Sequence, residues 1–180
     1  MSIFDKNFKE ILSTQIVSII GGLIAGTILA VYTKQIFLIP GIFVILPGLL
    51  EMRNNLSGSF AARLSSGLFL GVVNPNKLNT KATRGNFIAS FLLALVTSIA
   101  LGLTAFLVNI IFFHTNTPII ILIPIIVGLI ANAIEIPLTL VLTFYFFKKG
   151  HDPNNIMGPF ITSTGDIISI ISLLITLIII

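Results

Sequence analysis

Long apolar segments separated by short polar connections account for most of the chain. Five such segments follow one another, and each is long enough to cross a bilayer as a helix, which takes about 20 residues. We therefore expect helices over residues 11–32, 36–70, 87–113, 119–147 and 155–180. This pattern predicts an all-α integral membrane protein with five transmembrane helices, in which residues 1–180 form a single transmembrane domain.

The second segment differs from the others because it contains Pro47 and then an unusually polar run. A straight helix over residues 36–70 would be about 50 Å long at 1.5 Å per residue, whereas the hydrocarbon core of a bilayer is about 30 Å thick. We expect this helix to tilt strongly, to break at Pro47, or to extend into the cytoplasm. The clearest loop of the chain follows it over residues 71–86.

The composition excludes a water-soluble fold. Hydrophobic residues make up 56% of the chain and charged residues 9%, whereas soluble domains contain about 25% charged residues. The absence of cysteine excludes disulfides and thiolate metal sites. The first apolar segment is too long for a signal peptide, so we expect it to be retained as a helix.

The distribution of basic residues predicts the orientation in the membrane. Seven lysines and arginines fall in connections on one side, and a single lysine falls on the other: Lys6, Lys9, Lys77, Lys81, Arg84, Lys148 and Lys149 against Lys34. Because lysine and arginine prefer the cytoplasmic side, we expect the N-terminus inside and the C-terminus outside a cell (plasma) membrane. The net charge of +4 is thereby assigned to cytoplasmic loops rather than to nucleic-acid binding.

Five ionisable residues fall inside the apolar segments: Glu51, Arg53, Arg63, Glu135 and Asp166. Each costs at least about 2.5–3.5 kcal/mol near the bilayer centre and therefore requires a partner, a wet cavity or a function. Asp166 would lie about 16 Å along a helix that starts near residue 155. Thr162 and Ser169 share its helical stripe. This stripe predicts a pore-lining face for a hard cation, and the alternative is a hydrogen bond from another helix to Asp166.

The polar run after Pro47 supplies further candidates. Glu51 and Asn55 would face a cavity if the helix broke there, and Asn55 offers a neutral oxygen ligand. The alternative is a structural salt bridge from Glu51 to Arg53 or Arg63. Arginines repel cations and are therefore weak candidates for a cation path.

Two more acidic residues leave alternatives open. Glu135, with Asn132 three positions earlier, could be a second cation or proton ligand or the partner of an arginine. Asp152 could cap the last helix or form a cation site at the inner mouth. The sequence contains no glycine-rich phosphate loop, nucleophile elbow or HExxH motif, so we do not expect an enzyme.

Two stretches together resemble the membrane domain of MgtE-type magnesium transporters and the related solute-carrier magnesium transporters. They are PGLLEMRNNLSGSFAARLSSG at residues 47–67 and DPNNIMGPFITSTGD at residues 152–166. The resemblance implies a homodimer in which the second and fifth helices of both subunits line a path for Mg²⁺. It also implies that Asp166 binds the ion from both subunits, and that Asn55 and Asp152 match the family's asparagine and acidic residue.

The chain departs from that family at two points. Arg53, Asn54 and Asn55 stand where bacterial members typically have Gly-Gly-Asn, and we expect no large cytoplasmic regulatory domain. Oxygen ligands favour Mg²⁺ or Mn²⁺ over softer metals and do not separate the two. We expect the lipid bilayer, divalent cations and a second copy as partners, with no nucleic acid and no organic cofactor. The alternative functions are a substrate-capture subunit of an ATP-driven vitamin transporter and a membrane assembly protein without flux.

Overall fold

The computed structural model describes residues 6–37, 39 and 41–180, and every regular element in these ranges is helical. In chain order the elements are α1 (Lys6–Val31), α2 (Thr33–Ile36), α3 (Ile42–Phe69), α4 (Lys81–Phe113), the 3₁₀ helix η1 (Pro118–Ile121), α5 (Leu122–Lys148) and α6 (Pro153–Ile179). The predicted all-α fold is confirmed for the described part of the chain.

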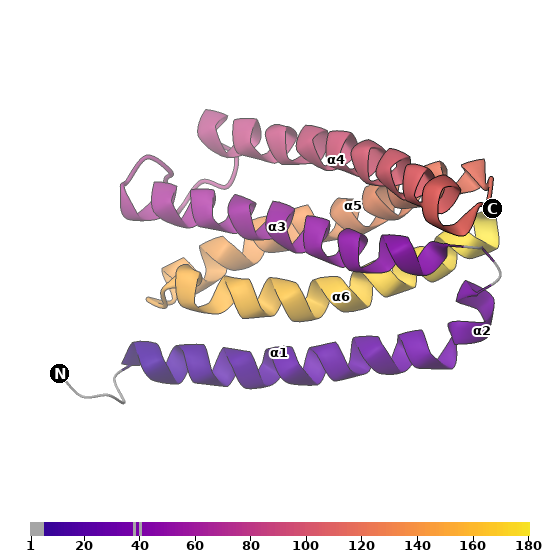
Figure 1. The fold of residues 1–180 in the computed structure, drawn as a ribbon. Coiled ribbons are helices and arrows are strands. Elements are labelled where there is room, and N and C mark those ends of the chain that lie inside the picture. Colours follow the sequence, from indigo (N-terminus) through magenta and orange to yellow (C-terminus); the bar gives the residue numbers. More distant parts are fainter. Residues whose placement is uncertain (1–5, 38, 40) are drawn as a thin grey trace.

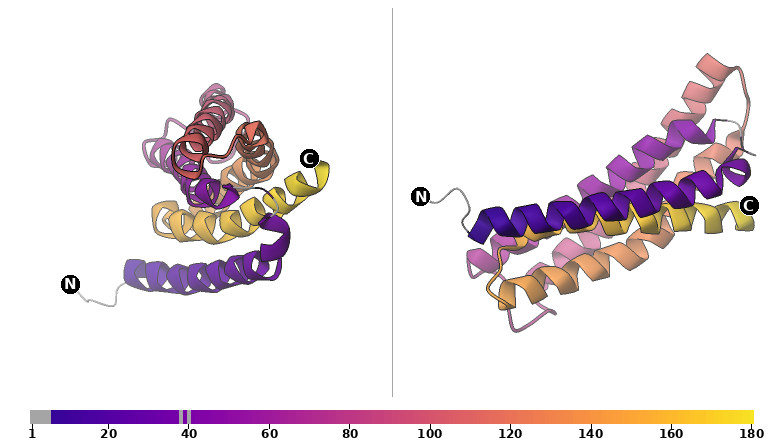
Figure 2. Two further views of the ribbon diagram at one scale, coloured as in Figure 1. Left: turned by 45° about the vertical axis from the view of Figure 1, so that its right-hand side comes forward. Right: turned by 90° about the horizontal axis from the view of Figure 1, so that it is seen from below.

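The long helices form a bundle with one outer helix. Figure 1 shows α3 between α4 and α6 with α5 behind them, and α1 on the outer side of α6. The views in Figure 2 show the same order, with α6 between α1 and the rest. Only Gly21 and Ala25 of α1 are buried. A side chain at Gly21 would collide with Ser163, so the glycine permits the close approach of α1 to α6.

Membrane-spanning capacity is unequal among these helices. Within the described residues, four segments are long and apolar enough to cross a bilayer, namely α1, α4, η1 with α5, and α6. Helix α3 has 28 residues, which is about 42 Å at 1.5 Å per residue, but it carries Glu51, Arg53 and Arg63. The fold is therefore that of a multi-pass membrane protein with four apolar helices and one polar helix.

Helix α3 begins later than residue 36. Gly41 precedes it with φ of 76°, in the left-handed region that favours glycine, and so separates α3 from α2. Residues 38 and 40 of the predicted segment lie outside the described residues. Of the three alternatives for this segment, a break at Pro47 does not occur: Pro47 is the sixth residue of α3, and the helix continues through it.

The starts of other helices also differ from the predicted ones. Helix α4 begins at Lys81 instead of residue 87 because the Thr80 hydroxyl caps it, accepting a hydrogen bond from the Thr83 N–H at 3.1 Å. The loop predicted over residues 71–86 is correspondingly shorter. Helix α1 starts at Lys6 and α6 starts at Pro153, where proline suits the first helical position.

The apolar core is divided along the helix axes. One group of buried side chains, which includes Leu49, Val127 and Leu173, lies toward α2. Other groups, which include Phe60, Ile136 and Ile161, lie farther along the bundle. In α3, α5 and α6, a charged side chain stands in the sequence between the members of these groups, so these three helices share a polar layer between apolar ones.

Candidate cation site

Three charged residues stand near the centres of three adjacent helices. Glu135 is the middle residue of the 27 in α5, and Asp166 is the middle residue of the 27 in α6. Arg53 lies close to the middle of α3. If these helices span a bilayer, all three charges lie near its midplane, where water is least available.

Arg53 connects the two carboxylates. Its Nη1 atom lies 2.6 Å from Glu135 Oε1, and its Nη2 atom lies 3.2 Å from Asp166 Oδ1. Nη2 also donates to Asn54 Oδ1 at 2.8 Å, and Nη1 donates to the Ile161 carbonyl at 3.4 Å. One arginine between two ionised carboxylates leaves the triad of Arg53, Glu135 and Asp166 with a formal charge of −1.

Gly165 makes room for this arrangement. A Cβ atom at Gly165 would overlap the guanidinium group of Arg53. The guanidinium therefore rests directly on the backbone of α6, beside Asp166 and one turn from Ile161. Any larger residue at position 165 would displace it.

The triad is closed on one side and open on the other. The side chains of Arg53 and Glu135 are 2% and 1% exposed, whereas that of Asp166 is 20% exposed. Two polar atoms in the closed part, Arg53 Nε and Glu135 Oε2, have no hydrogen-bond partner among the described residues. Buried polar atoms are rarely left unpaired, so these two atoms are exceptions to the usual pairing.

An exposed polar stripe runs along α3, defined here as Glu51, Asn55 and Ser59. These residues recur every fourth position and so share one face of the helix. Asn55 Nδ2 donates to Glu51 Oε1 at 3.1 Å, and the Ser59 hydroxyl donates to the Asn55 carbonyl at 2.6 Å. Helix α3 packs against α6, so this stripe lies on the neighbour of the helix that carries Asp166.

The salt bridge from Glu51 to Arg53 or Arg63, which was the alternative for Glu51, does not form among the described residues. Arg53 pairs with Glu135 and Asp166 instead. Arg63 donates to Asn86 Oδ1 and to the Ser90 hydroxyl, both at 3.0 Å, and so ties α3 to α4. Of the alternatives left open for Glu135, pairing with an arginine is the one that the structure contains.

The remaining candidates are spread along the bundle. The Asp152 carboxylate caps α6 by accepting from the Asn154 N–H at 2.8 Å, and it lies fourteen residues before Asp166, which is about 21 Å along a helix. Thr162 donates to the Gly158 carbonyl, and Asn132 donates to the Gly128 carbonyl. Ser169 is buried, and its hydroxyl lacks a partner among the described residues.

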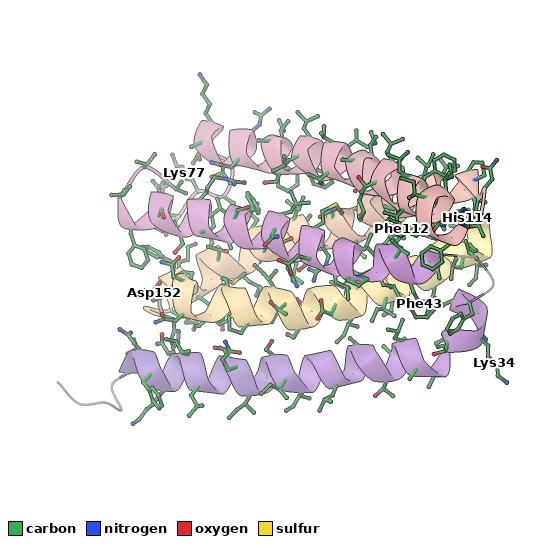
Figure 3. All side chains as sticks on the ribbon, viewed as in Figure 1. Lys34, Phe43, Lys77, Phe112, His114 and Asp152 are labelled. Carbon is green, nitrogen blue, oxygen red and sulfur yellow. The ribbon has the colours of Figure 1, made fainter. Side chains whose placement is uncertain are left out.

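Polar and charged side chains also lie at the two ends of the bundle, and those at one end form a cluster. Figure 3 shows Lys77 and Asp152 at one end and Lys34 and His114 at the other. At the first end Glu10 is surrounded by polar groups from the start of α6: His151 Nδ1 lies 2.8 Å from Glu10 Oε1, and Asn155 donates to Glu10 Oε2 at 3.5 Å. Lys6 lies 3.7 Å from the same carboxylate. We call Lys6, Glu10, His151 and Asn155 the end cluster.

No group of three or more acidic, histidine or cysteine side chains that could hold a metal ion occurs within the described residues. Asp166 is the one carboxylate of the triad with an appreciable exposed surface. A cation at Asp166 would therefore need its other ligands from water, neutral oxygens or another chain.

Comparison with known protein families decides what kind of protein this is. The family model for MgtE, described as a divalent cation transporter, matches residues 46–176, which is well over half of the chain. The chain belongs to the MgtE family of divalent cation transporters. No curated protein and no solved structure matches it.

The matched region of this MgtE family member starts within α3 and ends within α6. It therefore contains the whole triad and the polar stripe. The resemblance inferred from residues 47–67 and 152–166 is confirmed at the level of the family. The family is one of transporters, not of enzymes.

The role of Arg53 is the main feature that the residue pattern did not predict. Its two acidic partners come from α5 and α6, far away in the sequence, and nothing local specifies which carboxylate an arginine will reach. Gly165 offered one clue, since a small residue beside a membrane-embedded aspartate permits close approach by another group. That clue does not say which group approaches.

Proposed function

We propose that this MgtE family member carries Mg²⁺ across the cell membrane through a path between two copies of the chain, lined by α3 and α6. The observation that carries the proposal is the Asp166 carboxylate. It lies at the centre of a membrane-length helix, is 20% exposed, and stands beside a helix with an exposed polar stripe. Hard cations such as Mg²⁺ select oxygen ligands of this kind.

The second copy is inferred from the cost of polar groups in lipid. Glu51, Asn55 and the open side of Asp166 would meet hydrocarbon if a single chain stood alone in a bilayer. A two-fold axis beside α3 and α6 would instead bring both polar stripes and both Asp166 carboxylates around a shared aqueous path. Two facing carboxylates repel each other when the site is empty, and a divalent ion relieves that repulsion better than a monovalent one.

The other candidate residues take supporting roles in this proposal. Asn55 and Thr162 would supply neutral oxygens along the path, and Ser169 and Asn132 would lie deeper in the protein. Asp152 lies about half the length of α6 away from Asp166 and would attract cations at the inner mouth of the path. The family match supports cation transport over the vitamin-capture and assembly alternatives.

The direct test is Mg²⁺ uptake into proteoliposomes by wild type, Asp166→Ala and Asp166→Asn. We expect both variants to lose most of the flux while remaining folded, because each removes the negative charge of the proposed ion site. Glu10→Gln is the comparison variant, since it neutralises a carboxylate of the end cluster instead of the one at the middle of α6. Normal magnesium flux in both Asp166 variants would show that the proposed path is wrong.

The interface has its own test because the chain contains no cysteine. Ser59→Cys places one thiol on the polar stripe, and Leu92→Cys places one on the exposed apolar surface of α4. We expect oxidation in membranes to link two copies through position 59 and not through position 92. Linking through position 92 alone would place the interface elsewhere.

A further inference from the structure

The carboxylate proposed to bind the transported ion already has a cation of the protein's own beside it. Arg53 Nη2 lies 3.2 Å from Asp166 Oδ1 and so occupies one side of the carboxylate. A divalent ion that binds Asp166 would meet the positive charge of this guanidinium at close range. Ion binding therefore requires that the repulsion between the ion and the guanidinium be overcome, be screened, or be relieved by movement of the arginine.

The contacts of Arg53 are unequal in a way that indicates where it would go. Its contact with Glu135 is the shorter one, at 2.6 Å, and both of those side chains are almost fully buried. Its contact with Asp166 is longer, and Asp166 is the exposed member of the triad. The shortest contact of Arg53 is therefore with α5, and its longer contacts, with Asp166 and the Ile161 carbonyl, are with α6.

A second arrangement is available without new partners. Arg53 Nε and Glu135 Oε2 are both buried and lack partners among the described residues. Arginine binds a carboxylate best through two parallel N–H···O bonds. If the guanidinium turned so that its Nε–Nη2 edge faced Glu135, both nitrogens would donate in parallel to the two carboxylate oxygens, and Nη2 would leave Asp166.

We infer that Arg53 is a tethered counter-ion that neutralises Asp166 in the empty site and withdraws to Glu135 when a divalent cation binds. Glu135 and Gly165 are positioning residues in this device: Glu135 holds the arginine, and Gly165 leaves the space through which it reaches Asp166. The inference rests on the proposed function, because it assumes that Asp166 is the ion ligand. Two triads of charge −1 in a dimer carry −2, which one divalent cation balances.

The device predicts opposite changes in ion affinity from two neutral substitutions. Arg53→Gln removes the competing cation, so Mg²⁺ should bind about tenfold more tightly, and release and maximal flux should fall. Glu135→Gln removes the anchor and leaves Arg53 on Asp166, so Mg²⁺ should bind about tenfold more weakly. A purely structural role would instead weaken binding and stability together in both variants.

The measurement is the MgCl₂ dependence of thermal stability for the full chain in lipid nanodiscs, together with the half-saturating concentration for flux in proteoliposomes. Arg63→Gln is the control for Arg53→Gln, because Arg63 lies on the same helix and contacts no carboxylate in the described residues. Gly165→Ala should also tighten Mg²⁺ binding by displacing the guanidinium. Gly158→Ala is its control, since a Cβ there meets nothing within 4 Å.

If Arg53→Gln fails to fold, the double variant Arg53→Gln/Glu135→Gln replaces it, because it keeps the net charge of the triad. Its Mg²⁺ affinity should exceed that of Glu135→Gln by about tenfold, since no arginine then competes for Asp166. Equal affinities in these two variants, or shifts of Arg53→Gln and Glu135→Gln in the same direction, would overturn the counter-ion role.

The two proposals fail in different ways. If wild type binds Mg²⁺ through Asp166 and the Arg53 and Glu135 variants do not move its affinity in opposite directions, the counter-ion inference alone is wrong. If wild type shows no magnesium response that Asp166→Asn removes, the proposed ion site is wrong, and the counter-ion inference is overturned with it.

Discussion

Two clusters of carboxylates and cations lie along α6 and use similar contacts in different surroundings. In the triad, Arg53 meets Glu135 and Asp166 at 2.6 and 3.2 Å, midway along the helices. In the end cluster, His151 and Lys6 meet Glu10 at 2.8 and 3.7 Å, at the start of α6. Judged by contact distance alone, the two clusters would be expected to contribute similarly to stability.

The exposure of their cations separates them, although the carboxylates do not follow this order, since Glu10 is 10% exposed and Asp166 is 20% exposed. Lys6 and His151 are 68% and 42% exposed, whereas Arg53 is 2% exposed. Ion pairs in water contribute about 0–1 kcal/mol because solvent screens them and the side chains lose entropy. Removing one partner of a buried pair costs far more, since the other charge stays behind without water. The comparison teaches that burial, and not contact length, decides where a charge change will matter in this protein.

The largest predicted effect comes from Arg53→Ala, which leaves the Glu135 and Asp166 carboxylates without a counter-ion. We expect a loss of about 3–5 kcal/mol in the free energy of unfolding, or failure to accumulate folded protein. The measurement is the folded yield and thermal midpoint in detergent.

Arg63→Ala is the matched control for this variant, because Arg63 lies ten residues along the same helix and contacts only neutral groups, Asn86 and Ser90. A smaller loss from Arg53→Ala than from Arg63→Ala would contradict the conclusion that a buried charge pair is the costlier one to break.

This distinction was only partly visible in the sequence. The helical fold followed from the long apolar segments, and the mid-helix position of Asp166 followed from its place within the last one. Both are local properties, since hydropathy and depth along a helix depend on neighbouring residues. The family motif at residues 152–166 is local in the same sense.

Partner choice could not be predicted in this way. A salt bridge to Glu51, two residues away, was one alternative for Arg53, but the bundle turns Arg53 toward α5 and α6. Which carboxylate it reaches depends on how three helices pack. The later start of α3 likewise depends on the positive φ of Gly41, which the apolar pattern does not reveal.

An intermediate effect is expected at Asp152, which lies beside the end cluster and caps α6. Asp152→Ala removes the acceptor for the Asn154 N–H and should cost about 1 kcal/mol of stability. Asp152→Ser keeps a capping oxygen and removes the charge, so stability should stay near wild type. Thermal unfolding of both variants measures this difference.

The same pair of variants separates the two roles considered for Asp152. If the carboxylate attracts cations at the mouth of the path, Asp152→Ser should raise the half-saturating Mg²⁺ concentration although the cap is intact. If Asp152→Ser has the same dependence of flux on Mg²⁺ concentration as wild type, Asp152 acts only as a helix cap.

The smallest effect is expected from Glu10→Gln, which removes the charge of the end cluster while keeping the shape of the side chain. Because Lys6 and His151 are 68% and 42% exposed, solvent screens their contacts with Glu10, and the loss should stay within about 1 kcal/mol. This loss of stability should also shrink as salt is raised, since the Debye length falls from about 10 Å at 0.1 M to about 3 Å at 1 M.

Thermal midpoints of wild type and Glu10→Gln in 0.1 M and 1 M NaCl measure this salt dependence, with Arg53→Gln/Glu135→Gln as the buried counterpart. A difference from wild type that vanishes with salt for Glu10→Gln and persists for the buried double variant is the expected result; equal salt sensitivity would mean that water reaches the triad as freely as it reaches the end cluster.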